Sequence, residues 1–97
     1  MVKNSDPSRT VDENEAGLSV EWSQIEGEGL VRVVPTEDFK TGVLLVAELA
    51  QIAEAQNHDP EVLLTNDKVV ITLYSHDVQD VTERDIKFAR TVDELIG

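Results

Sequence analysis

The feature that most restricts the fold of this chain is a long segment of helical periodicity with a proline on each side. Pro35 precedes the segment and Pro60 follows it, and proline interrupts helices and central strands. Two adjacent apolar stripes run along it at helical spacing: Phe39, Val43, Val46, Ala50 and Ala53, then Gly42, Leu45, Leu49 and Ile52. We therefore predict a helix over residues 37–56, capped by Thr36 and ended by Asn57. Its wide apolar arc could cover a sheet and also meet a partner helix.

Strand patterns lie on both sides of this helix. Alternating apolar residues predict a first strand over residues 18–23 and a second over residues 30–34, joined by a glycine-containing turn. After the helix, residues 61–65 and 68–74 flank a tight turn. The sequence therefore predicts two β-hairpins, one before the helix and one after it.

A last helix is predicted after a loop over residues 75–81. Thr82 can cap it, with Asp85 three residues later, and apolar residues keep helical spacing up to Ile96. Two hairpins imply an antiparallel sheet, and the two helices would cover one of its faces. The predicted fold class is α+β, a two-layer sandwich of a four-stranded antiparallel sheet with helices packed on one face.

Size and charge limit the classes of function. A chain of 97 residues allows one modest core, which oligomerisation often supplements. The formal net charge of −12, with scattered basic residues, argues against binding to nucleic acid or to anionic membranes. The chain has no cysteine, no long apolar run and no secretory signal, so we expect a cytoplasmic protein without membrane spans. Residues 1–16 are expected to form a mobile N-terminal tail, followed by one domain over residues 17–97.

Both histidines of the chain are followed by an aspartate, and they mark the candidate site. His58 and Asp59 follow the long helix, whereas His76 and Asp77 follow the fourth strand. Imidazole exchanges protons near neutral pH, so the pattern favours acid–base chemistry. Structural explanations remain open: His58 could satisfy the helix end, Asp59 could belong to a turn, and Asp85 could be a capping residue alone. The spacing matches no known metal motif, so we expect no metal.

Further landmarks follow one another in a regular order. An acidic residue is followed by His and then Pro, and later come a Lys-Val turn, a Ser-His strand end and a Thr-x-x-Asp helix start. The positions are Glu54, His58, Pro60, Lys68, Val69, His76, Thr82 and Asp85, with Trp22, Arg32 and Phe39 upstream. On these positions, over about residues 18–97, the chain resembles the pterin-4a-carbinolamine dehydratase family. The resemblance implies the fold predicted above, assembled as a homodimer or homotetramer.

The resemblance also implies an activity. Members of the family dehydrate 4a-hydroxytetrahydropterin to quinonoid dihydropterin, which recycles the cofactor of aromatic amino acid hydroxylases. Carried over to this sequence, the catalytic residues would be His58, His76 and Asp85. The residues expected to bind the pterin substrate are Glu54, Asp59, Pro60 and Ser75. The pterin is the substrate, and the resemblance implies no further cofactor.

Several positions depart from the family pattern. Asp59 stands where the family has the second histidine of a pair, and a carboxylate is shorter than imidazole and a poor proton donor. Val62 and Asn66 replace aromatic residues, which should weaken stacking on a flat pterin, and Gln79-Asp80 replaces a glycine pair. These departures keep an alternative open: a catalytically inactive member that binds a protein partner, as the Rubisco assembly factors of some carboxysome bacteria do.

Overall fold

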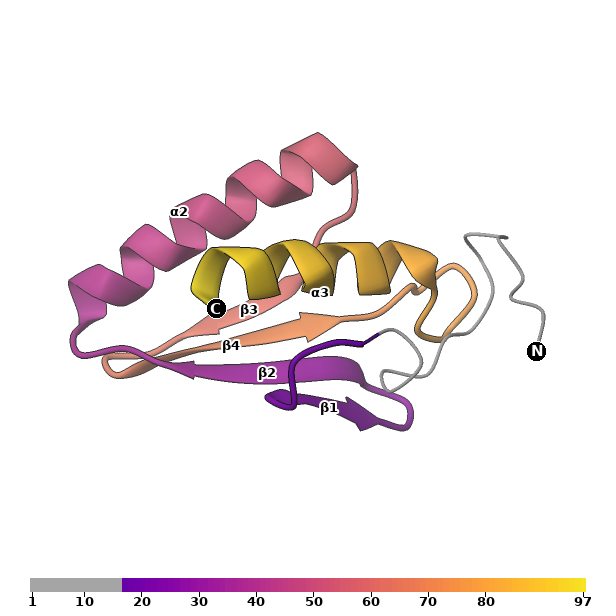
Figure 1. Ribbon diagram of the computed structural model, residues 1–97, viewed down its shortest axis with the longest axis horizontal. Coiled ribbons are helices and arrows are strands. Elements are labelled where there is room, and N and C mark those ends of the chain that lie inside the picture. The colour runs from indigo at the N-terminus through magenta and orange to yellow at the C-terminus, as the bar shows by residue number, and fades with distance from the viewer. Residues whose placement is uncertain (1–16) are drawn as a thin grey trace.

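The computed structural model describes residues 17–97, and the tail expected over residues 1–16 lies outside the described residues. The elements are β1 (Trp22–Ile25), β2 (Gly29–Pro35), α2 (Phe39–Gln56), β3 (Glu61–Leu64), β4 (Lys68–Leu73) and α3 (Glu83–Ile96). The strands form one antiparallel sheet in the order β1-β2-β4-β3. Both helices lie over the same face of this sheet (Figure 1). The predicted α+β fold, with a four-stranded antiparallel sheet and helices on one face, is confirmed.

The central pair of strands, β2 and β4, joins the two hairpins. Leu30 pairs with Leu73 at one end of this ladder, and Pro35 pairs with Lys68 at the other. Along β4, alternate residues from Val69 to Leu73 are fully buried, whereas the residues between them are half-buried. The alternation of residues along β4 therefore correctly indicates which face of the strand lies beneath the helices.

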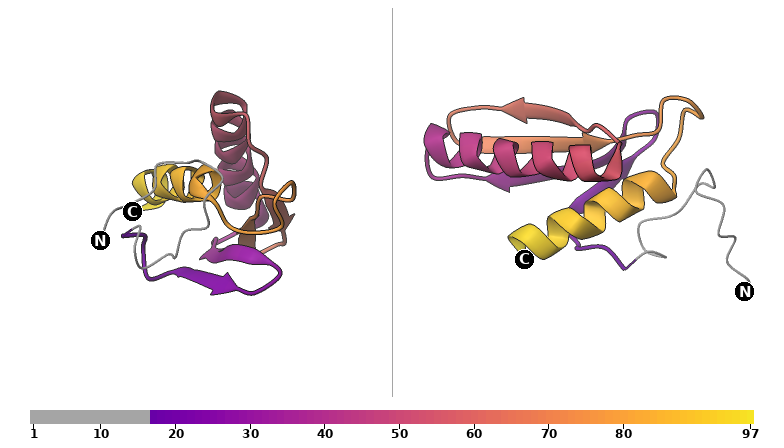
Figure 2. Two further views of the ribbon diagram at one scale, coloured as in Figure 1. Left: turned by 90° about the vertical axis from the view of Figure 1, so that its right-hand side faces the viewer. Right: turned by 90° about the horizontal axis from the view of Figure 1, so that it is seen from above.

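The two helices contribute differently to the core. Seen from above in Figure 2, α2 lies over β3 and β4, whereas α3 lies beside it, toward β1. The fully buried apolar side chains of α3 are Ile86, Phe88, Ala89 and Val92. On α2, Gly42 allows a close approach to the sheet, because a Cβ atom there would lie 2.5 Å from Cδ1 of Leu64. The helix α3 thus fills the centre of the core, and α2 closes the β3 side.

The first strand begins later than the alternation predicts. Residues 17–21 lie outside any strand, and β1 begins at Trp22. The backbone amide of Ser19 donates to Oδ2 of Asp93 over 2.9 Å, and the amide of Trp22 donates to the carbonyl of Ser19 over 3.2 Å. A carboxylate from the far end of the chain thus holds this segment in a turn, and local alternation does not decide its conformation.

The long helix α2 also begins later than predicted, at Phe39, and its N-cap is Asp38 rather than Thr36. Oδ1 of Asp38 accepts a hydrogen bond from the amide of Thr41 over 2.8 Å, as N-cap carboxylates do. This bond lowers the pKa of Asp38 below its ordinary value. At the other end, Asn57 adopts a left-handed backbone with φ of 51° and ends the helix as predicted.

A buried polar cluster ties the end of α3 to the first hairpin. Oδ1 of Asp93 accepts hydrogen bonds from Nε1 of Trp22 over 2.7 Å and from Nη1 of Arg32 over 2.6 Å. The Arg32 side chain also donates to the carbonyl of Gly97 over 3.4 Å, and Arg32 is only 5% exposed. Together with the amide of Ser19, three donors from the start of the described chain therefore converge on one carboxylate.

Candidate active site

Three of the predicted site residues meet at the N-terminus of α3, around the fully buried carboxylate of Asp85. Thr82 and Asp85 form a capping box, in which the amide of Thr82 donates to Oδ2 of Asp85 over 2.9 Å. The Ser75 hydroxyl donates to the same oxygen over 2.7 Å. Nε2 of His58 lies 2.6 Å from the other oxygen, Oδ1. Asp85 is therefore a capping residue and, through His58, also part of the candidate site.

The local structure brings these residues together from three elements. The left-handed backbone of Asn57 turns the chain after α2, and the amide of His58 donates to the carbonyl of Ala53 over 3.2 Å. Ser75 follows β4, and its amide donates to the carbonyl of Asp80 over 2.9 Å, which closes the base of the loop before α3. The loop thus returns directly to the first turn of α3.

The contact with Asp85 is the basis for assigning the two ring nitrogens of His58. The carboxylate accepts hydrogen bonds from both Ser75 and Thr82, and an ionised carboxylate acts only as an acceptor. We therefore assign Nε2 of His58 as the donor in its contact with Asp85. Nδ1 is then the ring nitrogen that can exchange a proton with a ligand. The His58 side chain is 12% exposed, so only a small part of it is accessible from solvent.

The structure does not place His76 in this network. Ser75 is buried, whereas His76 is the first residue of the turn that follows it and is exposed. The His76 ring packs edge-on against the ring of Tyr74, with 5.0 Å between centroids and 74° between planes. Tyr74 was not predicted as a site residue. Its place as the aromatic residue directly before Ser75-His76 is the signal that could have identified it.

The other predicted residues line a hollow between α2 and β3. Glu54, Asp59 and Pro60 belong to this hollow, whose volume is about 370 Å³. The remaining lining residues are apolar: Val46, Leu49, Ala50, Ala53 and Val62. Glu54 and Asp59 are exposed carboxylates, which offer hydrogen-bond acceptors beside this apolar surface. Such a lining suits a flat ring system that carries N–H donors.

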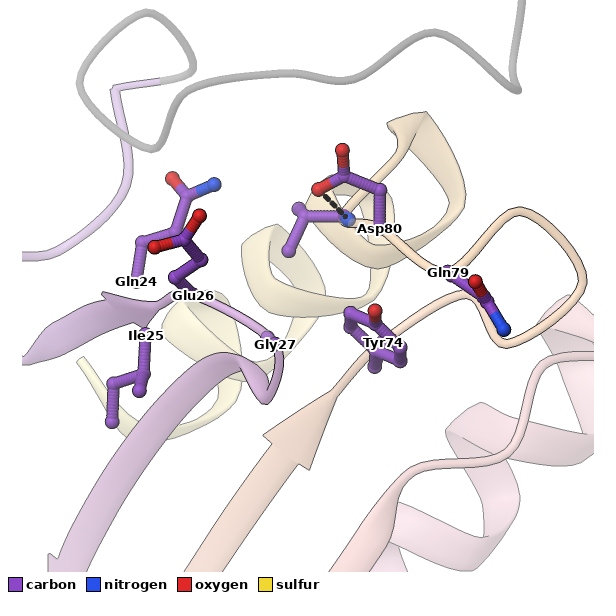
Figure 3. Close-up of a pocket in the computed structure, with 9 residues that line it drawn as sticks. Gln24, Ile25, Glu26, Gly27, Tyr74, Gln79 and Asp80 are labelled. Atoms are coloured by element: carbon purple, nitrogen blue, oxygen red, sulfur yellow. Dashed lines mark hydrogen bonds between the residues drawn. The ribbon is translucent and has the colours of Figure 1, made fainter.

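A larger hollow, of about 460 Å³, lies between the turn of the first hairpin and the loop before α3 (Figure 3). None of the predicted site residues lines it, although Tyr74 and Asp80 do. Gln79 also lines it and has a left-handed backbone with φ of 55°. Glycine adopts this backbone without strain, so Gln79 keeps a conformation suited to the glycine pair that it partly replaces. The larger hollow is therefore separate from the predicted pterin-binding residues.

Two kinds of site are not found among residues 17–97. No group of three or more His, Cys, Asp and Glu side chains in this part of the chain is arranged to hold a metal ion. No helix in the same range combines the length and the apolar composition that crossing a membrane needs.

Comparison with protein families and curated proteins gives one consistent result. Residues 7–95 match the family described as pterin 4 alpha carbinolamine dehydratase. Two similar proteins, from Aquifex aeolicus and Sulfurisphaera tokodaii, are each named "Putative pterin-4-alpha-carbinolamine dehydratase". The first is 41% identical over 61 residues, which cover 63% of this chain and 62% of the relative. The second is 32% identical over 75 residues, which cover 77% of this chain and 80% of the relative.

The fold is also similar to a solved structure. That crystal structure is described as a transcriptional coactivator/pterin dehydratase from Brucella melitensis. The TM-score is 0.77 at 34% sequence identity, and the match covers 87% of this chain and 92% of that chain. This neighbour is thus assigned two roles, one in transcription and one in pterin chemistry.

Proposed function

Because the chain belongs to the pterin-4a-carbinolamine dehydratase family, we propose that it dehydrates 4a-hydroxytetrahydropterins to quinonoid dihydropterins. In this reaction the pterin ring loses a proton from nitrogen and hydroxide from the neighbouring carbon, and the hydroxide leaves as water. One group must accept the ring proton, and another must donate a proton to the departing hydroxide. The observation that carries the proposal is the buried pair of His58 and Asp85, whose Nε2 and Oδ1 atoms are 2.6 Å apart.

The proposed roles follow from the contacts of each side chain. His58 exchanges the proton through Nδ1, because Nε2 faces Asp85. Asp85 is a positioning residue, since it is fully buried and acts through His58. Ser75 supports Asp85 in the same way, because its buried hydroxyl is within hydrogen-bond distance of both Asp85 and Thr82. His76 is exposed and is proposed as the second proton-exchanging group.

The hollow between α2 and β3 is proposed as the pterin-binding surface. Its apolar residues would pack on the ring, and the carboxylates of Glu54 and Asp59 would accept hydrogen bonds from the amino and N–H groups of the pterin. Val62 lines this hollow at a position where the family pattern has an aromatic residue. We therefore expect weaker stacking, and hence a higher KM, than an aromatic residue at this position would give.

A second candidate function is binding of a protein partner without catalysis. Asp59 replaces the second histidine of the family pair, which removes one imidazole from the expected set. The Brucella melitensis structure is described as a coactivator as well as a dehydratase. Under this alternative the scaffold is kept and the activity is lost, since function depends on the site rather than on the fold.

The two candidates are separated by the dehydration rate of the purified protein, measured beside its Asp59→His variant. We expect turnover above the spontaneous rate in the natural protein, and a higher rate in the variant, because the second imidazole adds a proton donor. Asp67→His is the matched control, since Asp67 lies in the exposed turn between β3 and β4. Activity in the variant alone would indicate a site disabled at residue 59. No turnover in either protein would reject the dehydratase proposal and favour the binding role.

We also propose that the protein forms a homodimer or homotetramer through the exposed face of α2. Large apolar side chains remain exposed there, with Leu44 at 59% and Phe39 at 54% exposure. We expect sedimentation equilibrium to give a dimer or larger species, and Leu44→Glu to shift it toward the monomer. Leu63→Glu is the control, because Leu63 is similarly exposed but lies on the sheet. A monomeric natural protein would contradict this proposal.

A further inference from the structure

The loop before α3 is buried and hydrogen-bonded at its base, whereas its tip is exposed to solvent. At the base, Ser75 exchanges backbone hydrogen bonds with Asp80, over 2.9 Å and 3.3 Å, and its hydroxyl lies 2.8 Å from that of Thr82. At the tip, residues 76–79 are all exposed, and His76 is one of them. Since the base is buried and hydrogen-bonded, any freedom of the loop is concentrated at the tip that carries His76.

One ion pair connects this tip to the first turn of α3. Nη2 of Arg84 donates to Oδ1 of Asp77 over 2.6 Å. The hydrogen bond from Arg84 lowers the pKa of Asp77 below its ordinary value, so Asp77 is charged at neutral pH. Arg84 is the residue directly before Asp85. The first turn of α3 therefore makes two contacts: Asp85 contacts His58, and Arg84 pairs with Asp77 in the loop that carries His76.

We propose that Arg84 is a positioning residue for catalysis, whose ion pair with Asp77 holds His76 at a fixed place relative to the His58–Asp85 pair. This inference rests on the proposed dehydratase function. His58 follows α2 and faces Asp85, whereas His76 follows β4 and packs on Tyr74, so the separation of the two rings depends on how the loop is held. Two proton-exchanging groups must reach one substrate together, and small displacements of such groups have large effects on rate.

The stability of the protein is not expected to depend on this ion pair. Asp77 and Arg84 are both solvent-accessible, and exposed pairs contribute little to stability because water and salt screen them. A fall in rate on breaking the pair would therefore not be explained by unfolding. This separation of rate from stability is what distinguishes a positioning role from a merely structural one.

The test uses Arg84→Gln and Asp77→Asn, which remove charge while keeping hydrogen-bonding groups. We expect kcat to fall about tenfold in each, with KM changed by less than about twofold, because the proposed pterin-binding hollow does not include the loop. The melting temperature is expected to stay within about 4 °C of the natural protein. Arg84→Lys, which keeps the charge, should recover most of the lost kcat. Lys87→Gln is the matched control, since it removes a positive charge from the exposed side of the same helix.

High salt gives an independent check. Salt screens the exposed pair, so it should lower kcat of the natural protein more than that of Arg84→Gln, in which the pair is already absent. Equal salt dependence of the two proteins, or an unchanged kcat in Arg84→Gln, would overturn the inference.

A measurement without substrate separates this inference from the proposed function. Backbone ¹⁵N relaxation of residues 76–79 is expected to show lower order parameters in Arg84→Gln than in the natural protein or in Lys87→Gln. Unchanged order at the tip would overturn the positioning role even if the enzyme is active. Lower order at the tip, in a protein that shows no turnover, would reject the dehydratase function and with it any catalytic role for Arg84.

Discussion

Replacing His58 by Gln is expected to lower kcat for carbinolamine dehydration by a factor of about 10²–10⁴, while the fold stays intact. Gln has no group that exchanges protons near neutral pH, but its amide can still donate to Oδ1 of Asp85, as Nε2 of His58 does. The rate of the purified variant, compared with the spontaneous rate, measures the effect. Natural turnover in His58→Gln would remove His58 from the mechanism.

The choice of substitution matters because His58 also has a structural role. In His58→Ala, the buried carboxylate of Asp85 keeps its bonds to Ser75 and Thr82 but loses the imidazole. An unsatisfied buried polar group costs about 1–3 kcal/mol, so this variant should lose stability as well as activity. His76→Ala is the informative comparison, since His76 is exposed and its removal should abolish turnover without a change in stability.

Replacing Asp93 by Ala is expected to lower the free energy of unfolding by about 3 kcal/mol, the low end for a buried ion pair, because the Asp93 side chain is 20% exposed but its loss leaves the buried charge of Arg32 uncompensated. Arg32 is only 5% exposed, so its guanidinium cannot recover its hydration without a change of structure. The same substitution removes the acceptor of Nε1 of Trp22 and of the Ser19 amide. Urea denaturation followed by Trp22 fluorescence would report the loss directly.

The neighbouring residue provides the control for this experiment. Glu94 is exposed on the same turn of α3, so Glu94→Ala should change the free energy of unfolding by less than about 0.5 kcal/mol. Asp93→Asn should lie between the two, because an amide oxygen still accepts hydrogen bonds but carries no charge to pair with Arg32. Equal stability of Asp93→Ala and Glu94→Ala would mean that the cluster makes no net contribution to stability.

Local patterns predicted much of the fold, and long-range contacts account for the differences. The strict alternation of β4 and the capping box of Thr82 and Asp85 both arise within a few residues, and both are present as predicted. The first strand was placed too early, because a carboxylate 74 residues away captures the amide of Ser19. The residues around Ser19 do not indicate that Asp93 will accept this hydrogen bond, so their alternation alone favoured a strand.

The candidate site was predicted in part. The family pattern pointed to His58 and Asp85, but their direct contact depends on how the end of α2 and the start of α3 are placed, which spacing along the chain does not determine. The hydrogen bonds of the Ser75 hydroxyl with Thr82 and Asp85 likewise depend on tertiary placement, and its predicted role in substrate binding stays a prediction. Whether these residues act on a pterin stays a prediction until the assays are done.

The order of strands in the sheet has a consequence for how the chain is made. The first hairpin leaves the ribosome before β4 exists, yet β2 needs β4 as its second neighbour, with Leu30 paired to Leu73. A lone two-stranded hairpin is marginally stable in water. The hydrogen bonds from Trp22 and Arg32 to Asp93 likewise cannot form until the last turn of α3 has been synthesised. The native four-stranded sheet therefore cannot form before β4, which ends at Leu73, has been synthesised.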